Sequence, residues 1–295
     1  MQDQPSPPTV RDAVQRATQR LRDAGSPSPR LDAEVLLAHV TGRDRSWILA
    51  HPDASIEAEP YDALLDRRAA GEPIAYIRGF KEWRSHRIRT DARALIPRPE
   101  TELLAEAAMA EIAARLGRDA PVVAWEVATG TGAVALAVAL RFRGALAAQR
   151  LTLLATDLSP EALELAAENL AAHDVGPVVQ LERADLLEGA GASWPRPHVA
   201  IANLPYVASG EVDERRGSLG FEPRIALDGG PDGLDLLRRL LADLPTRAAP
   251  GATVFLEIGV GQADVIARLA PARASVSVVP DLAGLDRVVR IEMPD

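Results

Sequence analysis

The amino-terminal part of the chain carries apolar residues three or four positions apart, which is the spacing of amphipathic helices. Three segments have this pattern: residues 10–21, 31–40 and 61–70. Pro-containing breaks at 25–29 and 52–53 separate them. The pattern predicts a small all-helical domain over residues 1–72, in which the polar, Pro-rich residues 1–9 are expected to be disordered.

Short apolar runs dominate the rest of the chain. Period-two alternation over 74–96 predicts a β-hairpin in a linker formed by residues 73–96. Further strands are predicted at 121–127, 151–156, 178–181, 199–202, 253–258, 275–279 and 287–291. Runs that are apolar throughout are typical of buried parallel strands, so an α/β domain is expected over 97–295. Residues 206–232 are expected to be mostly loop, and loops of that length are often functional.

A strand-to-helix turn with two glycines follows the first strand of this domain. It reads Ala128-Thr129-Gly130-Thr131-Gly132 and leads into a helical stretch at 133–142. Glycines here let the backbone approach a ligand closely, but a dinucleotide fingerprint would need a third glycine where Ala135 stands. With Glu126 before it, the loop better fits a ligand that carries positive charge and no phosphate. A tight turn without a ligand is the alternative.

Acidic residues end the next two strands. Asp157 is placed to bind ribose hydroxyls, and Ser159-Pro160 after it has the composition of a helix start. Asp185 follows the third strand and is placed to accept from an adenine amino group. Each carboxylate alone is more typical of a helix cap or a solvated position. Together with Glu126 they indicate one ligand site at the carboxyl edge of the sheet.

The tetrapeptide Asn203-Leu204-Pro205-Tyr206 follows the strand at 199–202. An Asn side chain offers one acceptor and two donors, which suits a planar substrate NH2 group. A strand followed by an ordinary turn is the alternative, since Asn and Pro are common turn residues. Its position downstream of the glycine loop and the acidic strand ends favours a substrate site.

In this order, the loop, Asp157 and the tetrapeptide resemble those of class I S-adenosylmethionine-dependent methyltransferases that act on amide or exocyclic amine nitrogens. Additional segments are similar to the HemK-type release factor glutamine N5-methyltransferases: residues 30–39, 71–77, 95–102, 221–230, 256–262 and 281–289. The Pro-Arg-Pro-Glu-Thr-Glu run at 97–102 and the Phe-Glu-Pro-Arg run at 221–224 are the most specific to this family. Related tetrapeptides also occur in DNA and RNA amino-methyltransferases.

The resemblance implies a class I methyltransferase fold, which is Rossmann-like: a mostly parallel seven-stranded sheet with helices on both faces, preceded by the helical domain and the hairpin linker. It implies S-adenosyl-L-methionine as cofactor. The implied acceptor is the glutamine of the Gly-Gly-Gln loop in peptide chain release factors, a modification that belongs to translation termination. The helical domain is expected to recognise the substrate, and the enzyme is expected to be a cytoplasmic monomer.

The resemblance also assigns residues. The implied cofactor-binding residues are Glu126, Thr129, Gly130, Thr131, Gly132, Asp157, Leu158, Asp185, Leu186 and Asn203. The Asn203 side-chain carbonyl and the Leu204 backbone carbonyl would accept the two N–H bonds of the amide, with Pro205 holding the turn and Tyr206 packing against the amide plane. Substrate docking is expected from Arg98, Glu100, Phe221 and Arg224, and a structural ion pair is the alternative for Arg98 and Glu100.

Two departures from the family pattern stand out. Leu204 replaces the first Pro of Asn-Pro-Pro-Tyr; it keeps the backbone carbonyl but loses the fixed φ of proline. In the loop, normally Asp-x-Gly-Thr-Gly-x-Gly, Glu126 replaces Asp and Ala128 replaces Gly. Glu keeps the charge, whereas Ala128 is expected to be tolerated only if that position does not need a positive φ.

Composition argues against several other kinds of protein and site. A net charge of -9 makes the chain a poor candidate for non-specific nucleic-acid binding, and the absence of cysteine excludes disulfides. The five His residues show no metal-ligand spacing, and no apolar run is long enough to span a bilayer. Two alternatives stay open: an amino-methyltransferase acting on another acceptor such as a nucleic-acid base, and a divergent, inactive binding protein.

Overall fold

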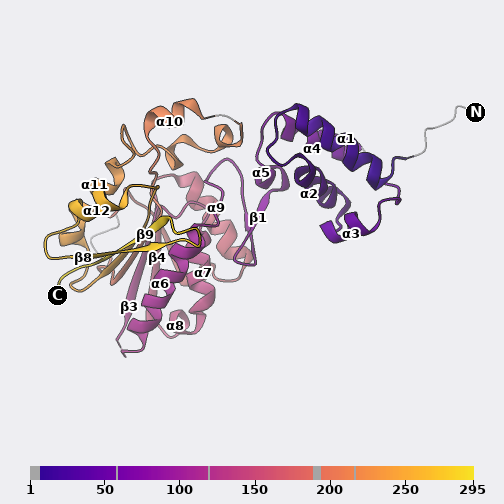
Figure 1. Ribbon diagram of the computed structural model, residues 1–295. Helices are drawn as coiled ribbons and strands as arrows, with labels where there is room; N and C mark the ends of the chain where they lie inside the picture. Colours follow the sequence, from indigo (N-terminus) through magenta and orange to yellow (C-terminus); the bar gives the residue numbers. More distant parts are fainter. Residues whose placement is uncertain (1–6, 58, 119, 189–193, 216) are drawn as a thin grey trace, which may run out of the picture. The chain divides into compact units, whose positions relative to one another are not determined.

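The computed structural model describes residues 7–57, 59–118, 120–188, 194–215 and 217–295. The chain divides into two compact units (Figure 1). The amino-terminal unit comprises Met1–Phe80 together with Arg216–Phe221, and the sheet unit comprises Lys81–Arg215 and Glu222–Asp295.

Five α-helices build the described part of the amino-terminal unit: α1 (Val10–Asp23), α2 (Pro29–Thr41), α3 (Arg45–Ala50), α4 (Glu59–Ala69) and α5 (Ile74–Arg78). Their buried residues, including Leu21, Leu36 and Leu37, form a separate core. The Thr9 side chain caps α1, and the Ile56 N–H donates to the Pro8 carbonyl. The expected disorder is therefore wrong for Pro8 and Thr9, while residues 1–6 lie outside the described part.

A buried ion pair ties this unit together. The Arg68 Nε lies 2.7 Å from the Asp32 carboxylate, and both side chains are almost fully buried. Ser26 and Ser28 also donate to that carboxylate. The second guanidinium nitrogen of Arg68 donates to the Ser218 hydroxyl at 3.0 Å, so the residue 217–221 segment completes the environment of this ion pair. Such a network stabilises the fold only while every charge keeps its partners.

The sheet unit contains a two-stranded hairpin and a seven-stranded sheet in the order β5-β4-β3-β6-β7-β9-β8. Its strands are β1 (Phe80–Trp83), β2 (His86–Arg89), β3 (Val122–Val127), β4 (Leu151–Asp157), β5 (Val179–Arg183), β6 (Val199–Ala202), β7 (Thr253–Glu257), β8 (Ser275–Pro280) and β9 (Asp286–Glu292). Strands β3 to β7 pair in parallel, and β9 pairs antiparallel with both β7 and β8. This confirms the mostly parallel seven-stranded sheet expected for the class I fold.

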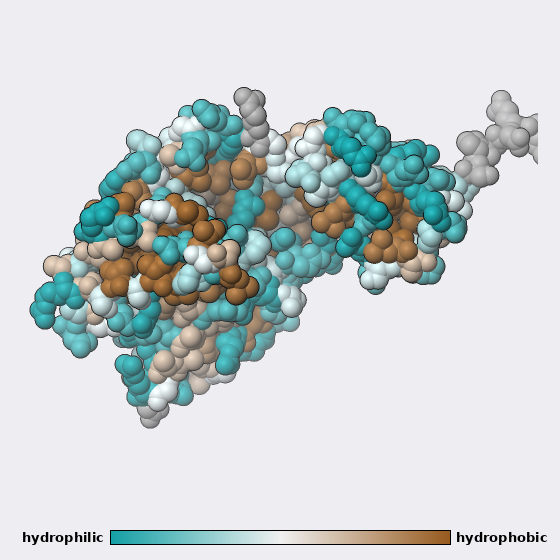
Figure 2. Space-filling view, in the orientation of Figure 1, coloured by the Kyte–Doolittle hydropathy of each residue, from teal (hydrophilic) through white to brown (hydrophobic). Residues whose placement is uncertain are grey.

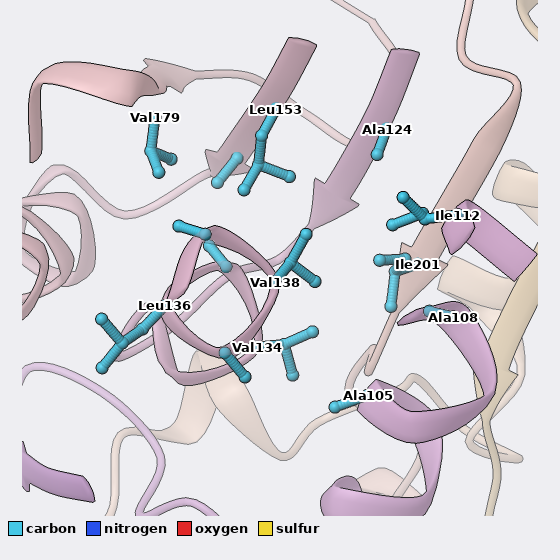
Figure 3. Packing of buried hydrophobic residues seen from close by; sticks show 14 of the residues in the cluster. Ala105, Ala108, Ile112, Ala124, Val134, Leu136, Val138, Leu153, Val179 and Ile201 are labelled. Carbon is cyan, nitrogen blue, oxygen red and sulfur yellow. The ribbon is translucent and has the colours of Figure 1, made fainter. Parts of the chain in front are cut away.

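Helices cover both faces of this sheet, because the central strands β3, β6 and β7 are mostly apolar and are buried at every position. The helices are α6 (Thr101–Leu116), α7 (Ala133–Arg141), α8 (Arg143–Ala147), α9 (Pro160–Ala172), α10 (Ser209–Glu214), α11 (Asp235–Arg247) and α12 (Ala263–Leu269). On one face, α6 and α7 pack their side chains against Ala124, Leu153 and Ile201 (Figure 3). On the other, α11 and α12 pack against Trp125 and Val254.

Several local predictions need correction. Residues 74–78 form α5 rather than strand, and the hairpin is confined to β1 and β2. The stretch predicted as loop between residues 206 and 232 contains α10 and two 3-10 turns, Gly217–Phe221 and Arg224–Ala226. Helix α3 was not predicted. These elements are short, so tertiary contacts rather than a long periodic pattern determine them.

On the face shown in Figure 2, hydrophilic residues are interspersed with apolar patches in both units. Within the described segments, no helix combines the length and the apolar character needed to cross a membrane.

Candidate active site

A cavity lies at the carboxyl ends of β3, β4 and β6. Strand β3 pairs with β4 on one side and with β6 on the other, so the strand order reverses at β3. Open α/β sheets bind ligands at such a switch point. The predicted residues that line the cavity are Arg98, Glu126, Thr129, Gly130, Thr131, Asp157, Leu158, Asp185, Leu186, Asn203, Leu204 and Pro205. Its described lining does not include Gly132, Glu100, Tyr206 or Arg224.

The glycine loop adopts three left-handed backbone conformations, with φ +58° at Ala128, +54° at Gly130 and +76° at Gly132. A Cβ on Gly132 would lie 3.0 Å from the Ala166 Cβ, so this glycine allows α7 and α9 to approach each other. Its role is therefore packing beneath the loop. Ala128, in contrast, does have a positive φ, which is the condition under which an alanine was expected not to be tolerated. This conformation costs an L-residue about 1–2 kcal/mol.

Glu126 is buried beneath the loop. Its carboxyl group accepts hydrogen bonds from the Thr129 hydroxyl at 2.7 Å and from the Ala135 N–H at 2.8 Å. Burial, with a smaller contribution from the charge of Asp157, raises the pKa of Glu126 to about 8 against the opposing effect of these two donors. A nearby cationic group would favour the ionised form. The side chain therefore fits the electrostatic role predicted for it.

Asp157 joins the glycine loop to the end of β4. Its carboxylate accepts from the Gly130 N–H at 2.8 Å and from the Ser159 N–H at 3.0 Å. Burial raises the pKa of Asp157, while the backbone donors at 159, 130 and 158 lower it. The Ser159 side chain caps α9 and Pro160 is its first residue, as the sequence predicts. Asp157 thus shapes the loop and also faces the cavity.

Asp185, the residue predicted to bind the adenine amino group, already has a partner within the protein. The Asp185 carboxylate forms an ion pair with Arg239 of α11 at 2.8 Å. Leu186, at φ +56°, and Leu158 line the same cavity with apolar surface. A carboxylate has several lone pairs, so Asp185 can accept from a second donor while it binds Arg239.

Three residues of the tetrapeptide reach the cavity: Asn203, Leu204 and Pro205. The Asn203 Nδ2 donates to the Thr101 hydroxyl at 3.2 Å, and the Leu204 side chain is buried. Tyr206 is half-buried, and burial raises its pKa to about 12. Its backbone carbonyl accepts from the Gln262 Nε2 at 3.1 Å, which anchors the end of the tetrapeptide.

Two of the residues predicted to dock the substrate, Arg98 and Arg224, form ion pairs within the protein. Arg98 pairs with Glu222 at 2.5 Å, rather than with Glu100, and the same buried carboxylate accepts from the Ile96 N–H at 3.0 Å. Arg224 is exposed and forms ion pairs with two aspartates, Asp213 and Asp228. Phe221 belongs to the amino-terminal unit and is partly exposed.

Sequence reasoning missed Thr101, which lines the cavity, and Glu222, which pairs with the lining residue Arg98. Both lie in the family-specific runs at 97–102 and 221–224. The runs marked the right segments. Which of their side chains would face the cavity depends on contacts between distant parts of the chain.

The lining fits the cofactor implied by the sequence. Glu126, Asp157 and Asp185 place carboxyl groups along one edge, which suits a ligand with an ammonium group, hydroxyls and an exocyclic amine. Leu158 and Leu186 add apolar surface for a flat ring. Among the residues that the structure describes, no three His, Asp or Glu side chains are grouped to hold a metal ion.

Residues 12–79 match the PrmC N-terminal domain family. The release factor glutamine methyltransferase of Deinococcus radiodurans is 39% identical over 95% of this chain and 97% of its own length. That of Koribacter versatilis is 35% identical over the same shares of the two chains. This chain belongs to the release factor glutamine methyltransferase family.

The family and methyltransferase class inferred from the motifs are thereby confirmed, and S-adenosyl-L-methionine is the cofactor of this class. Solved structures agree on the fold. A methyltransferase from Pyrococcus furiosus aligns with a TM-score of 0.50 at 17% identity, covering 81% of this chain and all of that one. The catalytic domain of hMettl16, in complex with a hairpin of the MAT2A 3′ untranslated region, aligns at 0.51 and 12%, covering 84% and 86%.

Proposed function

We propose that this protein transfers a methyl group from S-adenosyl-L-methionine to the N5 nitrogen of the glutamine in the Gly-Gly-Gln loop of peptide chain release factors. The observation that carries the proposal is the position of Asn203. Its amide lines the same cavity as the glycine loop and Asp157, so an acceptor amide held by Asn203 would lie beside the methyl donor. Near full-length similarity to release factor glutamine methyltransferases supports this acceptor.

An amide nitrogen is a poor nucleophile, because its lone pair is delocalised into the carbonyl group. When bound, the cofactor supplies an electrophilic methyl group on a positively charged sulfur. The protein must therefore orient the acceptor NH2 and exclude water. Holding two reactants in line can contribute about 7–11 kcal/mol in favourable cases. No strong base is required, since the methylated amide cation is acidic enough to lose its proton to water.

We assign the acceptor contacts to two carbonyl groups. The Asn203 Oδ1 and the Leu204 backbone oxygen would each accept one N–H of the glutamine amide, leaving the nitrogen lone pair directed at the methyl group. Leu204 retains this function because any residue supplies a backbone carbonyl. Pro205 favours an extended conformation at Leu204, because a proline disfavours the helical region for the residue before it.

The helical domain predicted at residues 1–72 is proposed to recognise the release factor, with residues 73–96 as the linker and 97–295 as the catalytic part. Arg98, Glu100, Phe221 and Arg224 are retained as proposed substrate contacts. We also propose a cytoplasmic monomer. A net charge of -9 supports a protein partner over non-specific contact with nucleic acid.

The deciding experiment is methyl transfer from labelled S-adenosyl-L-methionine to purified unmethylated release factor. A release factor with Gln→Ala in the Gly-Gly-Gln loop is the matched control. Label on the wild-type factor alone, together with its loss in the Asn203→Ala enzyme at nearly unchanged cofactor affinity, is the expected result. Label on a nucleic-acid substrate instead, or cofactor binding without any transfer, would reject the proposal in favour of one of the two alternatives.

A further inference from the structure

Glu257 is a buried acid beside the tetrapeptide to which the mechanism above gives no role. It is the last residue of β7 and is only 2% exposed. Strands β6 and β7 are parallel neighbours, and their last paired residues are Ala202 and Leu256. The next residues, Asn203 and Glu257, therefore leave the two strands at the same level. One carboxyl oxygen of Glu257, Oε2, has no hydrogen-bond partner within the described chain.

Three side chains meet at this point. The Asn203 Nδ2 donates to the Thr101 hydroxyl at 3.2 Å, and Thr101 is itself buried at the start of α6. Burial raises the pKa of Glu257, while its interactions with Thr101, Asn203 and Arg287 lower it and Glu100 raises it. The carboxyl group of Glu257 thus interacts with both members of the Thr101–Asn203 pair.

The two ends of an Asn amide have nearly the same shape but opposite hydrogen-bonding character. An ionised carboxylate only accepts hydrogen bonds, so it attracts the NH2 end of Asn203 and repels the oxygen end. The Thr101 hydroxyl can accept from that same NH2 while it donates to Glu257. This arrangement leaves the Asn203 oxygen for the cavity that Asn203 and Thr101 both line.

We propose that Glu257 and Thr101 are positioning residues that hold the Asn203 amide with its oxygen toward the acceptor. The inference rests on the proposed function, because it assigns Asn203 as the group that accepts an N–H of the substrate amide. A flipped Asn203 would present two donors to the two donors of the substrate and could not orient it. Glu257 therefore acts through Asn203, without contact to the reacting atoms.

The test compares single-turnover methyl transfer in Thr101→Val, Thr101→Ser, Glu257→Gln and the Thr101→Val/Glu257→Gln double variant. Thr101→Val replaces the hydroxyl by a methyl group of similar size. In Glu257→Gln, the new NH2 group can donate to the Asn203 oxygen and so stabilises the flipped amide. We expect the single variants Thr101→Val and Glu257→Gln each to lose about 10- to 100-fold in rate. Ser keeps the hydroxyl and should recover most of the rate. Because all act through one amide, the double variant should be no slower than the worse single variant.

Cofactor affinity, release factor KM and the urea midpoint are measured for every variant. The positioning role requires cofactor affinity and release factor KM to change by less than about twofold, and the urea midpoint to stay nearly unchanged, while the rate falls. Rate losses that multiply in the double variant, or that track cofactor affinity or stability, would overturn it. Full activity of Glu257→Gln beside an inactive Asn203→Ala enzyme would reject the inference alone. An inactive wild-type enzyme, or a fully active Asn203→Ala enzyme, would reject the proposed function and this inference with it.

Discussion

Ala128 shows how the loop imposes a conformation on one residue. The Thr129 N–H donates to the Thr156 carbonyl at 2.8 Å, and the next N–H, of Gly130, donates to Asp157. These two bonds fix the backbone that follows Ala128, so Ala128 has to adopt a positive φ although its Cβ disfavours it. The loop geometry is therefore maintained at a local cost.

Replacing Ala128 by Gly should stabilise the protein. Relief of the left-handed strain, about 1–2 kcal/mol, outweighs the extra backbone entropy that Gly loses on folding, so we expect a net gain of about 0.5–1 kcal/mol in the free energy of unfolding. Urea unfolding measures it. The control is Ala139→Gly within α7, where the same change should cost at least about 1 kcal/mol. Equal losses at both positions would contradict the assignment of strain to Ala128.

Glu126 should make both stability and cofactor affinity depend on pH. Below its ordinary pKa of 4.5 the folded and unfolded states are both protonated. Between pH 4.5 and the folded-state pKa of about 8, Glu126 ionises in the unfolded state only. The folded state then binds more protons, so the free energy of unfolding falls as pH rises. Above that range the contribution is constant.

Cofactor affinity should change in the opposite direction, since ionised Glu126 attracts the ammonium group. Titration calorimetry from pH 6 to about 9 should show affinity rising toward the folded pKa. Glu126→Gln cannot ionise and should flatten both profiles. A wild-type pH dependence that persists unchanged in this variant would assign it to another group.

At the residue scale, the sequence predicted the groups that follow directly from strand ends. Glu126, Asp157 and Asn203 were identified because parallel strands bring their carboxyl ends to one edge. The contacts of two other buried acids, Glu222 and Glu257, were not identifiable. Glu222 meets Ile96, and Glu257 meets Thr101, across separations of more than a hundred positions, which no local pattern encodes.

At the scale of elements, prediction succeeded where the chain has a continuous apolar run or a clear helix start signal. The buried strands β3 and β4 and the Ser159-Pro160 start of α9 are such cases. It failed for α5 and α10, which have only five and six residues. Helices this short are unstable alone, so their existence depends on packing against residues remote in the sequence.

The segment that leads into α6 is predicted to depend on the Arg98–Glu222 pair. Arg98→Met leaves the buried Glu222 carboxylate without its cation, and the Ile96 N–H at 3.0 Å stays as a hydrogen-bond donor. We therefore expect a loss of about 2 kcal/mol in the free energy of unfolding measured in urea. Arg84→Met is the control, because its partner Glu106 is mostly exposed and the pair should contribute less than about 1 kcal/mol. Similar small effects for both variants would favour a docking role for Arg98 over a structural one.

At the scale of the whole molecule, the chain builds separate hydrophobic cores. One core belongs to the helices of the amino-terminal unit, and two others lie on the two faces of the seven-stranded sheet. The amino-terminal core contains its own buried ion pair, Asp32–Arg68. Each unit therefore has the interactions needed for its own cooperative unfolding.

Breaking the Asp32–Arg68 pair should destabilise the amino-terminal unit selectively. Arg68→Met leaves a buried carboxylate without its cation, at an expected cost of about 3 kcal/mol. Hydrogen exchange read by mass spectrometry should quicken in α2 and α4 and stay unchanged in β3 and β4. The neighbouring Arg67→Met removes a more exposed pair with Glu72 and should cost no more than about 1 kcal/mol. Uniform acceleration across both units would show that they unfold as one.

Ser218 has a consequence for how the protein is made. The Ser218 hydroxyl accepts a hydrogen bond from Arg68 and donates one to the Gly71 carbonyl, yet Ser218 is synthesised about 150 positions after these two residues. At ribosomal rates of ~5–20 residues per second, several seconds separate their emergence. During that interval the nascent helices can assemble around Leu36 and Leu37. The Arg68 guanidinium, however, lacks one of its acceptors until Ser218 has been synthesised. The amino-terminal unit is thus the first to begin folding and among the last to be finished.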